Sequence, residues 1–392
     1  MIIGIDASRA FGSERTGTEN YSYYLISHIL RLPESKKHQF VLFLRPNVTI
    51  PAWNMLSGNQ QERAEWPDNV QMRVIHWRYL WTQVGLAAAT WQEKLDLLWI
   101  PAHTLPVLRR KRGLKTVVTI HGMEYEWLPQ YQNLLQRWYL PLSTKYAAIA
   151  ADKIIAVSNF TKKQLVEMLH ATSKKIKVIH EGVETSGLGN QVVRASERQS
   201  VGVSQVQRAL NKWKLRSKQY VLFVGTVQPR KNLAFLIDSF AQIPVSIRKQ
   251  LRLVIAGQEG WMAEEAYAAP AKYGVADQVL FLGRVSEAEL ATLYAGALFY
   301  AQPSITEGFG LPVLEAMERR VPVISSDGGA LPEVIGTAGL ICPLTTDSWV
   351  AGMRRMIGEP RLRERLAAAG KWRVRELSWE KAARATLEYL TS

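Results

Sequence analysis

The sequence predicts an α/β protein made of two doubly wound Rossmann-like domains that face a cleft. Its 392 residues exceed the usual size of a single domain, so two domains are expected. Short apolar runs alternate with segments of helical periodicity, which is typical of parallel sheets covered by helices. Because the alternation occurs in two series, we predict a first domain at residues 1–183, a linker region at 184–218 and a second domain at 219–375.

The first series begins at the N-terminus and predicts six buried strands. Their apolar runs lie at residues 2–5, 40–44, 97–100, 116–120, 153–157 and 176–179. Between the first two runs, apolar residues recur at the spacing of a helix that faces the sheet. These residues are Tyr21, Leu25, Ile29 and Leu30.

The second series follows a polar stretch rich in Ser, Gly, Gln and Arg at 184–218, whose latter part is also compatible with a helix. Its strands are predicted at 220–225, 251–257, 279–283, 298–301 and 321–324. Ser286 and Glu289 form a capping box at the start of one intervening helix. Open parallel sheets bind ligands beyond the C-terminal ends of their strands, so the loops after the strands should carry the chemistry.

Composition narrows the class of protein. The single cysteine, Cys342, excludes a disulfide framework, and the seven histidines show no paired metal-ligand spacing. No signal peptide and no apolar run long enough to span a bilayer are evident, so we expect a cytoplasmic protein. The net charge of +15 favours anionic partners, namely nucleic acid, acidic lipid or phosphorylated small molecules.

The most informative stretch is P-S-I-T-E-G-F-G-L-P-V-L-E-A-M at residues 303–317, which follows a predicted strand. Pro312 suits the first turn of a helix, so the amides of 308–311 should point outward toward an anion. Glu315 lies one turn inside this helix, where its carboxylate can bind vicinal hydroxyls, and Glu307 lies on the loop. An anion site between two carboxylates favours a phosphorylated sugar over a simple phosphate.

Two adjacent cations, Arg230 and Lys231, lie between another predicted strand and an amphipathic helix. A pair of cations on such a loop suits a diphosphate, and arginine adds a bidentate fork. An exposed basic turn is the alternative interpretation.

Together these blocks resemble the signature of glycosyltransferase family four, a large family of retaining GT-B enzymes. The resemblance rests on the E-x7-E spacing from Glu307 to Glu315 and on V-G-T-V-Q-P-R-K-N-L at 224–233. It also includes G-A-L-P-E-V at 329–334, S-W-E-K at 378–381 and, more loosely, T-I-H-G at 119–122 and A-V-S-N-F-T at 156–161. The resemblance covers essentially the whole chain and implies a GT-B fold whose C-terminal helix, residues 376–392, crosses back to the first domain.

The resemblance further implies roles for individual residues. Arg230 and Lys231 would neutralise the diphosphate of the leaving nucleotide, and Glu315 would bind its ribose. Glu307 would hold the donor sugar together with the loop at the helix start. The residues of that loop are Gly308, Phe309, Gly310 and Leu311.

Two residues of the first half complete the predicted site. His121 follows the strand at 116–120, and the family uses a histidine here near the sugar, although a structural histidine is equally compatible with the sequence. Gly17, in the first strand-to-helix loop, would let the backbone approach the diphosphate, or is a plain turn glycine. The predicted catalytic residues are His121, Glu307, Arg230 and Lys231.

We therefore expect a retaining, metal-independent hexosyltransferase without a cofactor. It would move a sugar from a GDP- or UDP-linked donor, with GDP-mannose favoured, to a glycan or lipid-linked acceptor. The alternatives are a sugar-nucleotide epimerase of GT-B-like architecture and a non-catalytic basic module that binds nucleic acid or membrane. Nucleic acid is not expected as a partner, because the best motifs lie in the less basic half of the chain.

Aromatic and basic residues gather in the first half of the chain. They predict an acceptor platform or a peripheral contact with the inner face of an anionic membrane, and ordinary packing is the alternative. They are Trp77, Tyr79, Trp81, Trp91, Arg109, Arg110, Lys111, Arg112, Tyr125, Trp127, Tyr131, Trp138 and Tyr139.

Overall fold

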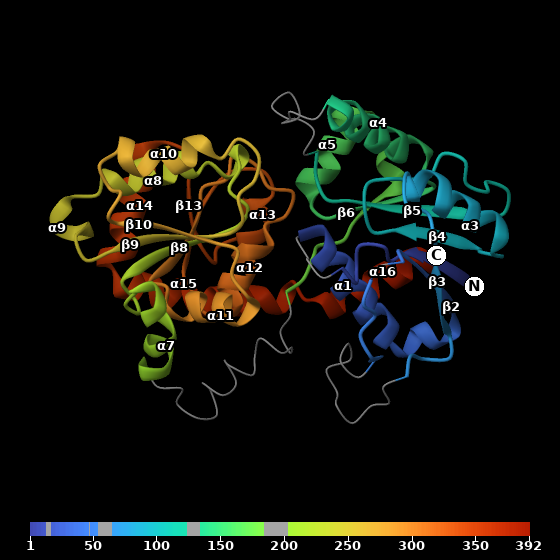
Figure 1. Ribbon diagram of the computed structural model, residues 1–392, viewed down its shortest axis with the longest axis horizontal. Coiled ribbons are helices and arrows are strands. Elements are labelled where there is room, and N and C mark those ends of the chain that lie inside the picture. The colour runs from blue at the N-terminus through green and yellow to red at the C-terminus, as the bar shows by residue number, and fades with distance from the viewer. Residues whose placement is uncertain (13–16, 47, 54–64, 124–133, 184–202) are drawn as a thin grey trace. The chain divides into compact units, whose positions relative to one another are not determined.

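The computed structural model in Figure 1 describes residues 1–12, 17–46, 48–53, 65–123, 134–183 and 203–392. The chain divides into two compact units. The first contains Met1–Glu184 together with Leu377–Ser392, and the second contains Thr185–Glu376.

The first unit is built on a parallel seven-stranded sheet of order β3-β2-β1-β4-β5-β6-β7. Its strands are β1 (Ile2–Asp6), β2 (Gln39–Leu44), β3 (Val70–Val74), β4 (Leu97–Ile100), β5 (Lys115–Ile120), β6 (Lys153–Ala156) and β7 (Ile176–Val178). The central strands are apolar on both faces because helices cover both sides of the sheet.

Helices cover both faces of this first sheet (Figure 1). α1 (Gly17–Arg31) lies beside α16 (Trp379–Thr391), where Tyr24 stacks on Trp379 at a ring-centroid distance of 5.7 Å. α3 (Ala87–Gln92), α4 (Leu134–Ala150) and α5 (Asn159–Leu169) pack on the other face around one apolar cluster. Shorter helical turns span Pro33–Lys37, Trp81–Leu86 and Ser173–Lys175.

The second unit repeats the same strand order with a six-stranded parallel sheet, β10-β9-β8-β11-β12-β13. Its strands are β8 (Tyr220–Val224), β9 (Arg252–Ala256), β10 (Val279–Gly283), β11 (Phe299–Gln302), β12 (Val323–Ser326) and β13 (Leu340–Cys342). In both sheets the order reverses beside the first strand of the unit, which is where ligands bind in open α/β sheets.

The helices of the second unit also form two layers. α8 (Leu233–Ala241), α10 (Glu264–Lys272) and α14 (Thr346–Gly358) share one apolar core with the sheet, whereas α12 (Leu311–Glu318) packs against α15 (Pro360–Glu376) (Figure 1). The remaining helices are α7 (Val203–Leu210), η5 (Asn211–Trp213), η6 (Pro229–Lys231), α9 (Val245–Arg248), α11 (Glu287–Gly296) and α13 (Leu331–Ile335).

The predicted fold class, two Rossmann-like α/β sheets, is confirmed, with two differences in detail. Strands β3 and β13 were not predicted, because β3 is a largely exposed edge strand with polar residues and β13 is only three residues long. In the latter part of the predicted linker region 184–218, for which a helix was the alternative, α7 forms and packs against α11 of the second unit.

Candidate functional site

The loops after β8 and β11 meet at the reversal point of the second sheet. Arg230 and Lys231 form the helical turn η6 after β8, and Glu307 lies on the loop after β11. Arg230 Nη1 lies 2.7 Å from Glu307 Oε2, and Lys231 Nζ lies 2.5 Å from Glu307 Oε1. Three residues that the sequence predicted in separate blocks are therefore in direct contact.

Glu307 is a buried carboxylate whose oxygens accept several hydrogen bonds. Besides the two cations, Ser304 Oγ donates to Oε1 at 2.7 Å and Gln302 Nε2 donates to Oε1 at 3.0 Å. Burial alone would raise the pKa of Glu307, but the charges of Lys231 and Arg230 lower its pKa to about 2. The carboxylate is thus ionised at neutral pH, and it holds both cations in place.

Two glycines allow the loop after β12 to pack against the loop that carries Glu307. A Cβ on Gly329, whose φ is +64°, would lie 2.4 Å from the Glu307 carbonyl oxygen, and a Cβ on Gly328 would lie 2.4 Å from that of Ile305. Ala330 N donates to the Glu307 carbonyl at 2.9 Å. The G-G-A-L-P-E-V block therefore supports the loop of Glu307 through its backbone.

α12 begins immediately after this loop. Gly310 is its N-terminal flanking residue with φ +105°, and Phe309 beside it is buried. The first N–H groups of a helix have no partner within the helix, so Gly310 and Leu311 lie at the positive end of the helix dipole, and Gly308 and Phe309 lead into it. The predicted anion-binding segment is a helix start in the structure.

Glu315 lies one turn inside α12. Tyr294 Oη, from α11, donates to Glu315 Oε2 at 3.1 Å. Burial, with the neighbouring charge of Glu315, raises the pKa of Tyr294 well above its ordinary value, so the phenol stays a donor. Tyr294 was not predicted from the sequence, because it lies within a helix and belongs to none of the motif blocks.

The first unit has a second cluster at the corresponding edge of its sheet. His121 follows β5, and its Nε2 lies 2.9 Å from the carbonyl oxygen of Pro101, which follows β4. Its Nδ1 lies 3.0 Å from Oε1 of the buried Glu181, which follows β7. The ring of His103 lies 5.5 Å from that of His121 between centroids. Sequence reasoning named His121 but missed His103 and Glu181, although both follow predicted strands.

Gly17 is the first residue of α1 in the first unit. No heavy atom lies within 4 Å of the position that its Cβ would occupy, so local packing does not require glycine here.

The predicted aromatic and basic surface is only partly exposed. Arg109 is buried and donates to the carbonyls of Pro106 and Ala150 at 3.0 Å and to Tyr146 Oη at 2.9 Å. Arg110 donates to the Leu95 carbonyl. Two of the four cations at 109–112 therefore bind backbone carbonyls of the first unit, which agrees with ordinary packing, the alternative for this segment.

The aromatic side chains of this predicted surface are likewise partly buried and partly exposed. Trp81 is buried, whereas Trp77, Tyr79, Trp91 and Tyr139 are exposed. Tyr125, Trp127, Tyr131 and the side chain of Trp138 lie outside the described residues.

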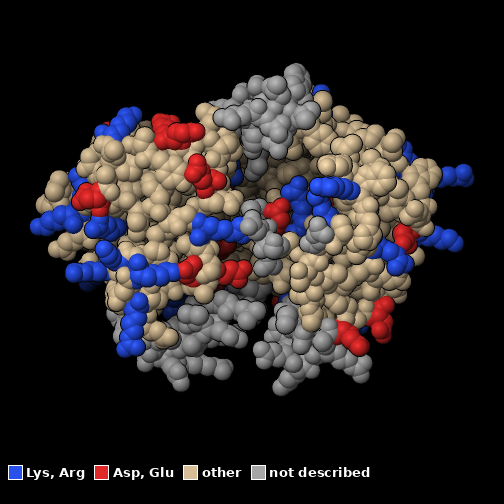
Figure 2. Space-filling view, in the orientation of Figure 1, with Lys and Arg blue, Asp and Glu red and all other residues tan. Residues whose placement is uncertain are grey.

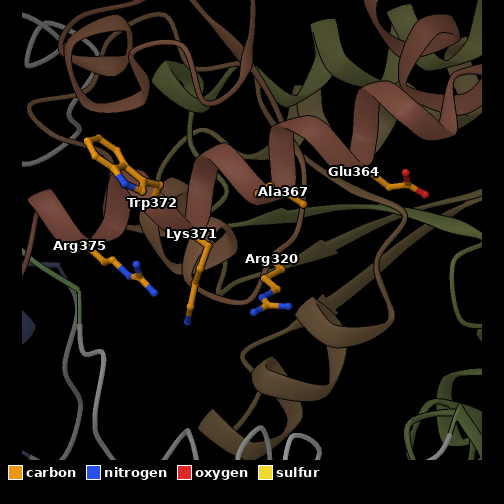
Figure 3. A pocket seen from close by; sticks show the side chains of 7 residues that line it. Arg320, Glu364, Ala367, Lys371, Trp372 and Arg375 are labelled. Carbon is orange, nitrogen blue, oxygen red and sulfur yellow. The ribbon is translucent and has the colours of Figure 1, made fainter.

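One cavity of about 460 Å³ lies on α15 of the second unit and contains none of the predicted site residues. Lys371 and Arg375 project from this helix on the same side as Arg320 (Figure 3). Lys371 Nζ is paired with Glu318 at 2.8 Å. On the face shown in Figure 2, basic side chains lie in several groups interspersed with acidic ones.

Metal-ligand clusters and membrane-spanning helices are both absent from the described part of the chain. No cluster of three or more His, Cys, Asp or Glu is placed there to hold a metal ion. No helix there has the length and hydropathy to cross a bilayer.

Two family models match most of the chain between them. Glycosyltransferase Family 4 matches residues 16–186, and Glycosyl transferases group 1 matches residues 207–373. Both matches fall on the units that the structure separates.

Curated relatives and solved structures agree with these matches. O-antigen chain mannosyltransferase B of Escherichia coli is 27% identical over 70% of this chain and 69% of its own length. A D-inositol 3-phosphate glycosyltransferase of Nocardioides is 31% identical over 61% of this chain, and the match spans about half, 53%, of that relative. HepE of Anabaena in complex with UDP-glucose superposes with a TM-score of 0.68 at 16% identity, covering 100% of this chain and 99% of that one.

The family models cover both units, and the solved structure shares the whole fold. The predicted family resemblance is therefore confirmed, and the chain belongs to glycosyltransferase family 4, the group 1 glycosyl transferases of GT-B fold.

Proposed function

We propose that this protein is a retaining hexosyltransferase that uses a nucleotide diphosphate sugar, with GDP-mannose as the favoured donor. The acceptor is a glycan or a lipid-linked glycan. The observation that carries the proposal is the convergence of Arg230 and Lys231 on the buried Glu307, beside the start of α12. Two desolvated cations next to a helix N-terminus suit a diphosphate.

The donor diphosphate competes with Glu307 for the two cations. A diphosphate carries more negative charge than one carboxylate, so it draws Arg230 and Lys231 toward itself. Glu307 is then available to accept a hydrogen bond from a hydroxyl of the donor sugar. Glu315, oriented by Tyr294, accepts from the ribose hydroxyls.

Transfer breaks the bond between the anomeric carbon and the phosphate oxygen, and the electron pair leaves with the diphosphate. Arg230, Lys231 and the amides at the start of α12 stabilise that charge, as preorganised donors do in an oxyanion site. The acceptor oxygen attacks from the same face, and its proton passes to the leaving diphosphate. These side chains perform the work of a divalent cation, so transfer requires no metal.

The similarity to the mannosyltransferase of Escherichia coli supports a mannosyl donor for this chain. The similarity to HepE, whose structure contains UDP-glucose, keeps UDP-sugars as the alternative donors. The test is a transfer screen of the full chain with GDP-, UDP- and ADP-sugars, in excess chelator and with added Mg²⁺ or Mn²⁺. The anomeric configuration of the product is read by NMR.

We expect transfer with retention that persists in chelator. A free epimerised sugar nucleotide without acceptor product would instead indicate the epimerase, and salt-sensitive DNA binding without transfer would indicate the basic module. Activity that is lost in chelator and restored by metal would overturn metal independence.

A variant pair tests the ribose contact. Glu315→Gln should weaken nucleoside diphosphate binding, measured by calorimetry, by roughly ten- to hundredfold, which corresponds to losing a charged hydrogen bond. Glu318→Gln is the matched control, because Glu318 is on the same helix and pairs with Lys371 instead. Equal affinities for Glu315→Gln and the wild type would remove Glu315 from the site.

We also propose that the first unit contacts anionic membrane. Leu142 and Ile149 of α4 are 62% and 59% exposed and lie on the same face as the exposed Lys145. Leu108, whose neighbour Arg109 donates to the carbonyl of Ala150 at the end of α4, is 74% exposed. Exposed apolar side chains flanked by lysine are typical of interfacial helices. Such a contact would bring the enzyme to a lipid-linked acceptor.

A further inference from the structure

The loops after three strands of the first unit surround His121. Glu181 follows β7 and is only 5% exposed, and the side chain of His121 is 13% exposed. Pro101 and His103 follow β4. None of these contacts involves the cations of the second unit, so this cluster has a chemistry of its own.

Hydrogen-bond chemistry assigns the protons of the His121 ring. The Pro101 carbonyl, 2.9 Å from Nε2, can only accept, so Nε2 carries a proton. The Glu181 carboxylate lies 3.0 Å from Nδ1, and in its ionised form it can also only accept, in which case Nδ1 carries a proton as well. A ring that donates from both nitrogens is an imidazolium, and its charge is balanced by Glu181.

Packing fixes the ring in this orientation. Tyr21 of α1 packs edge-on against His121 with 4.5 Å between ring centroids. Tyr21 is placed in turn by a 3.3 Å hydrogen bond from its hydroxyl to Thr119 Oγ1 and by its contact with Trp379. A rotated imidazole would lose both of these hydrogen bonds.

The backbone of Glu181 is equally constrained. A Cβ on the next residue, Gly182, would lie 2.1 Å from the amide nitrogen of Trp379, so the chain here passes directly against the start of α16. Val183 continues with a parallel bridge to Ser378. Glu181 is therefore presented to His121 from a rigid segment.

Within the part of the chain that the structure describes, the other titratable groups facing His121 do not compete for its charge. Burial, together with the charges of His121 and Arg9, lowers the pKa of His103 to about 3, so His103 is neutral. Burial raises the pKa of Tyr21, so its hydroxyl is neutral too. Arg9 pairs with Glu19 at 3.0 Å. Glu181 is left as the counter-charge of the His121 ring.

We infer that Glu181 is a positioning residue that holds His121 as a doubly protonated donor. This inference rests on the proposed glycosyl transfer for its consequence. An imidazolium with both N–H groups engaged cannot accept the proton of the acceptor hydroxyl. The proton therefore goes to the leaving diphosphate, and His121 contributes a fixed positive charge and the placement of the loop after β5.

The first test does not depend on activity. The full chain is labelled with ¹⁵N-histidine, the His121 signals are assigned with His121→Asn, and the ring ¹⁵N shifts are recorded from pH 6 to 9. We expect both nitrogens of His121 to be protonated at pH 7.5 in the wild type. In Glu181→Gln, an isosteric change, the amide can donate to Nδ1, so the ring should become neutral.

Two further variants separate this effect from a structural one. Glu93→Gln removes a carboxylate of the same unit that pairs with Arg73, and it should leave the His121 signals unchanged. Glu181→Asp keeps the charge and should restore part of the doubly protonated form. A neutral His121 ring in the wild type at pH 7.5, or an unchanged ring in Glu181→Gln, would overturn the inference.

Kinetics supply the second readout. Glu181→Gln should lower kcat by roughly ten- to hundredfold, the effect of losing one charge-assisted hydrogen bond, while KM for the donor stays constant. Partial recovery of kcat in Glu181→Asp supports the same assignment. If the wild type transferred no sugar at all, the proposed function would fail while the ¹⁵N result would still decide the role of Glu181. A fall in donor affinity with constant kcat would contradict a positioning role through His121.

Discussion

At the scale of single residues, Glu307 connects stability and function in the second unit. It is buried, it pairs with both Arg230 and Lys231, and it also accepts from Ser304 and Gln302. Truncating a cation therefore leaves a buried carboxylate with less compensation, which is costly in itself. For variants of Arg230 or Lys231, the free energy of unfolding must therefore be measured together with the affinity for the donor.

Lys231→Met should destabilise the second unit by about 3 kcal/mol. The reason is that the buried Glu307 carboxylate would lose one of the two positive charges that compensate its own. Adding Glu307→Gln should recover part of this loss. The measurement is the opening free energy of amides in β8 and β11 by hydrogen exchange. Strictly additive effects of the two changes would show that the pair does not interact energetically.

The low pKa of Glu307 predicts a pH dependence of stability. Its pKa is about 2 in the folded protein against an ordinary value of 4.5, so the ionised form is favoured in the folded state. The resulting stabilisation, on the order of 3 kcal/mol, is fully present above pH 4.5 and is lost as the pH falls toward 2. The opening free energy of β8 and β11 amides should fall over this range more steeply in the wild type than in Glu307→Gln. Parallel curves would contradict the assignment.

At the scale of elements, the loop after β12 supports the loop after β11. Gly329 and Gly283 have the same φ of +64°. A Cβ on Gly329 would collide with the Glu307 backbone, whereas no heavy atom lies within 4 Å of the position of a Cβ on Gly283. Comparing alanine at the two positions therefore separates the free-energy cost of a left-handed φ from the cost of the steric clash with the Glu307 loop.

Gly283→Ala should cost about 1–2 kcal/mol, the strain of an L-residue in the left-handed region. Gly329→Ala should cost about 1–3 kcal/mol more, because the loops are forced apart, and it should also weaken nucleoside diphosphate binding. Denaturant unfolding and calorimetry measure the two effects. Equal costs at both positions would mean that the loop contact is easily relaxed.

At the scale of the whole molecule, the exposed apolar face of α4 predicts membrane association. The full chain should sediment with anionic vesicles at low salt, and the bound fraction should fall as salt rises, since lysines near the surface contribute electrostatically. Leu142→Gln with Ile149→Gln should lower binding several-fold through loss of buried apolar area.

Val245→Gln is the control for that experiment, because Val245 is 63% exposed on α9 of the second unit. It should leave vesicle binding unchanged. Equal sedimentation of the wild type and the α4 double variant would remove this face as the membrane contact.

The sequence alone determined the two α/β series, most strand positions and the family motifs around Arg230 and Glu307. These features are local: helical and strand periodicity, turn residues and short motifs are each contained within about twenty residues. The edge strand β3 was not predicted, because it is largely exposed and its sequence lacks a continuous apolar run.

The tertiary structure decided which of these side chains meet. Parallel sheets bring together the C-terminal ends of strands that are far apart in the chain, so Arg230 and Glu307, 77 positions apart, form an ion pair. The same rule places Glu181 beside His121, 60 positions away. Burial was decided at this level too: the sequence left open whether Arg109 is exposed or packed, and Arg109 is buried because folding brings the Ala150 carbonyl, 41 positions away, to its guanidinium.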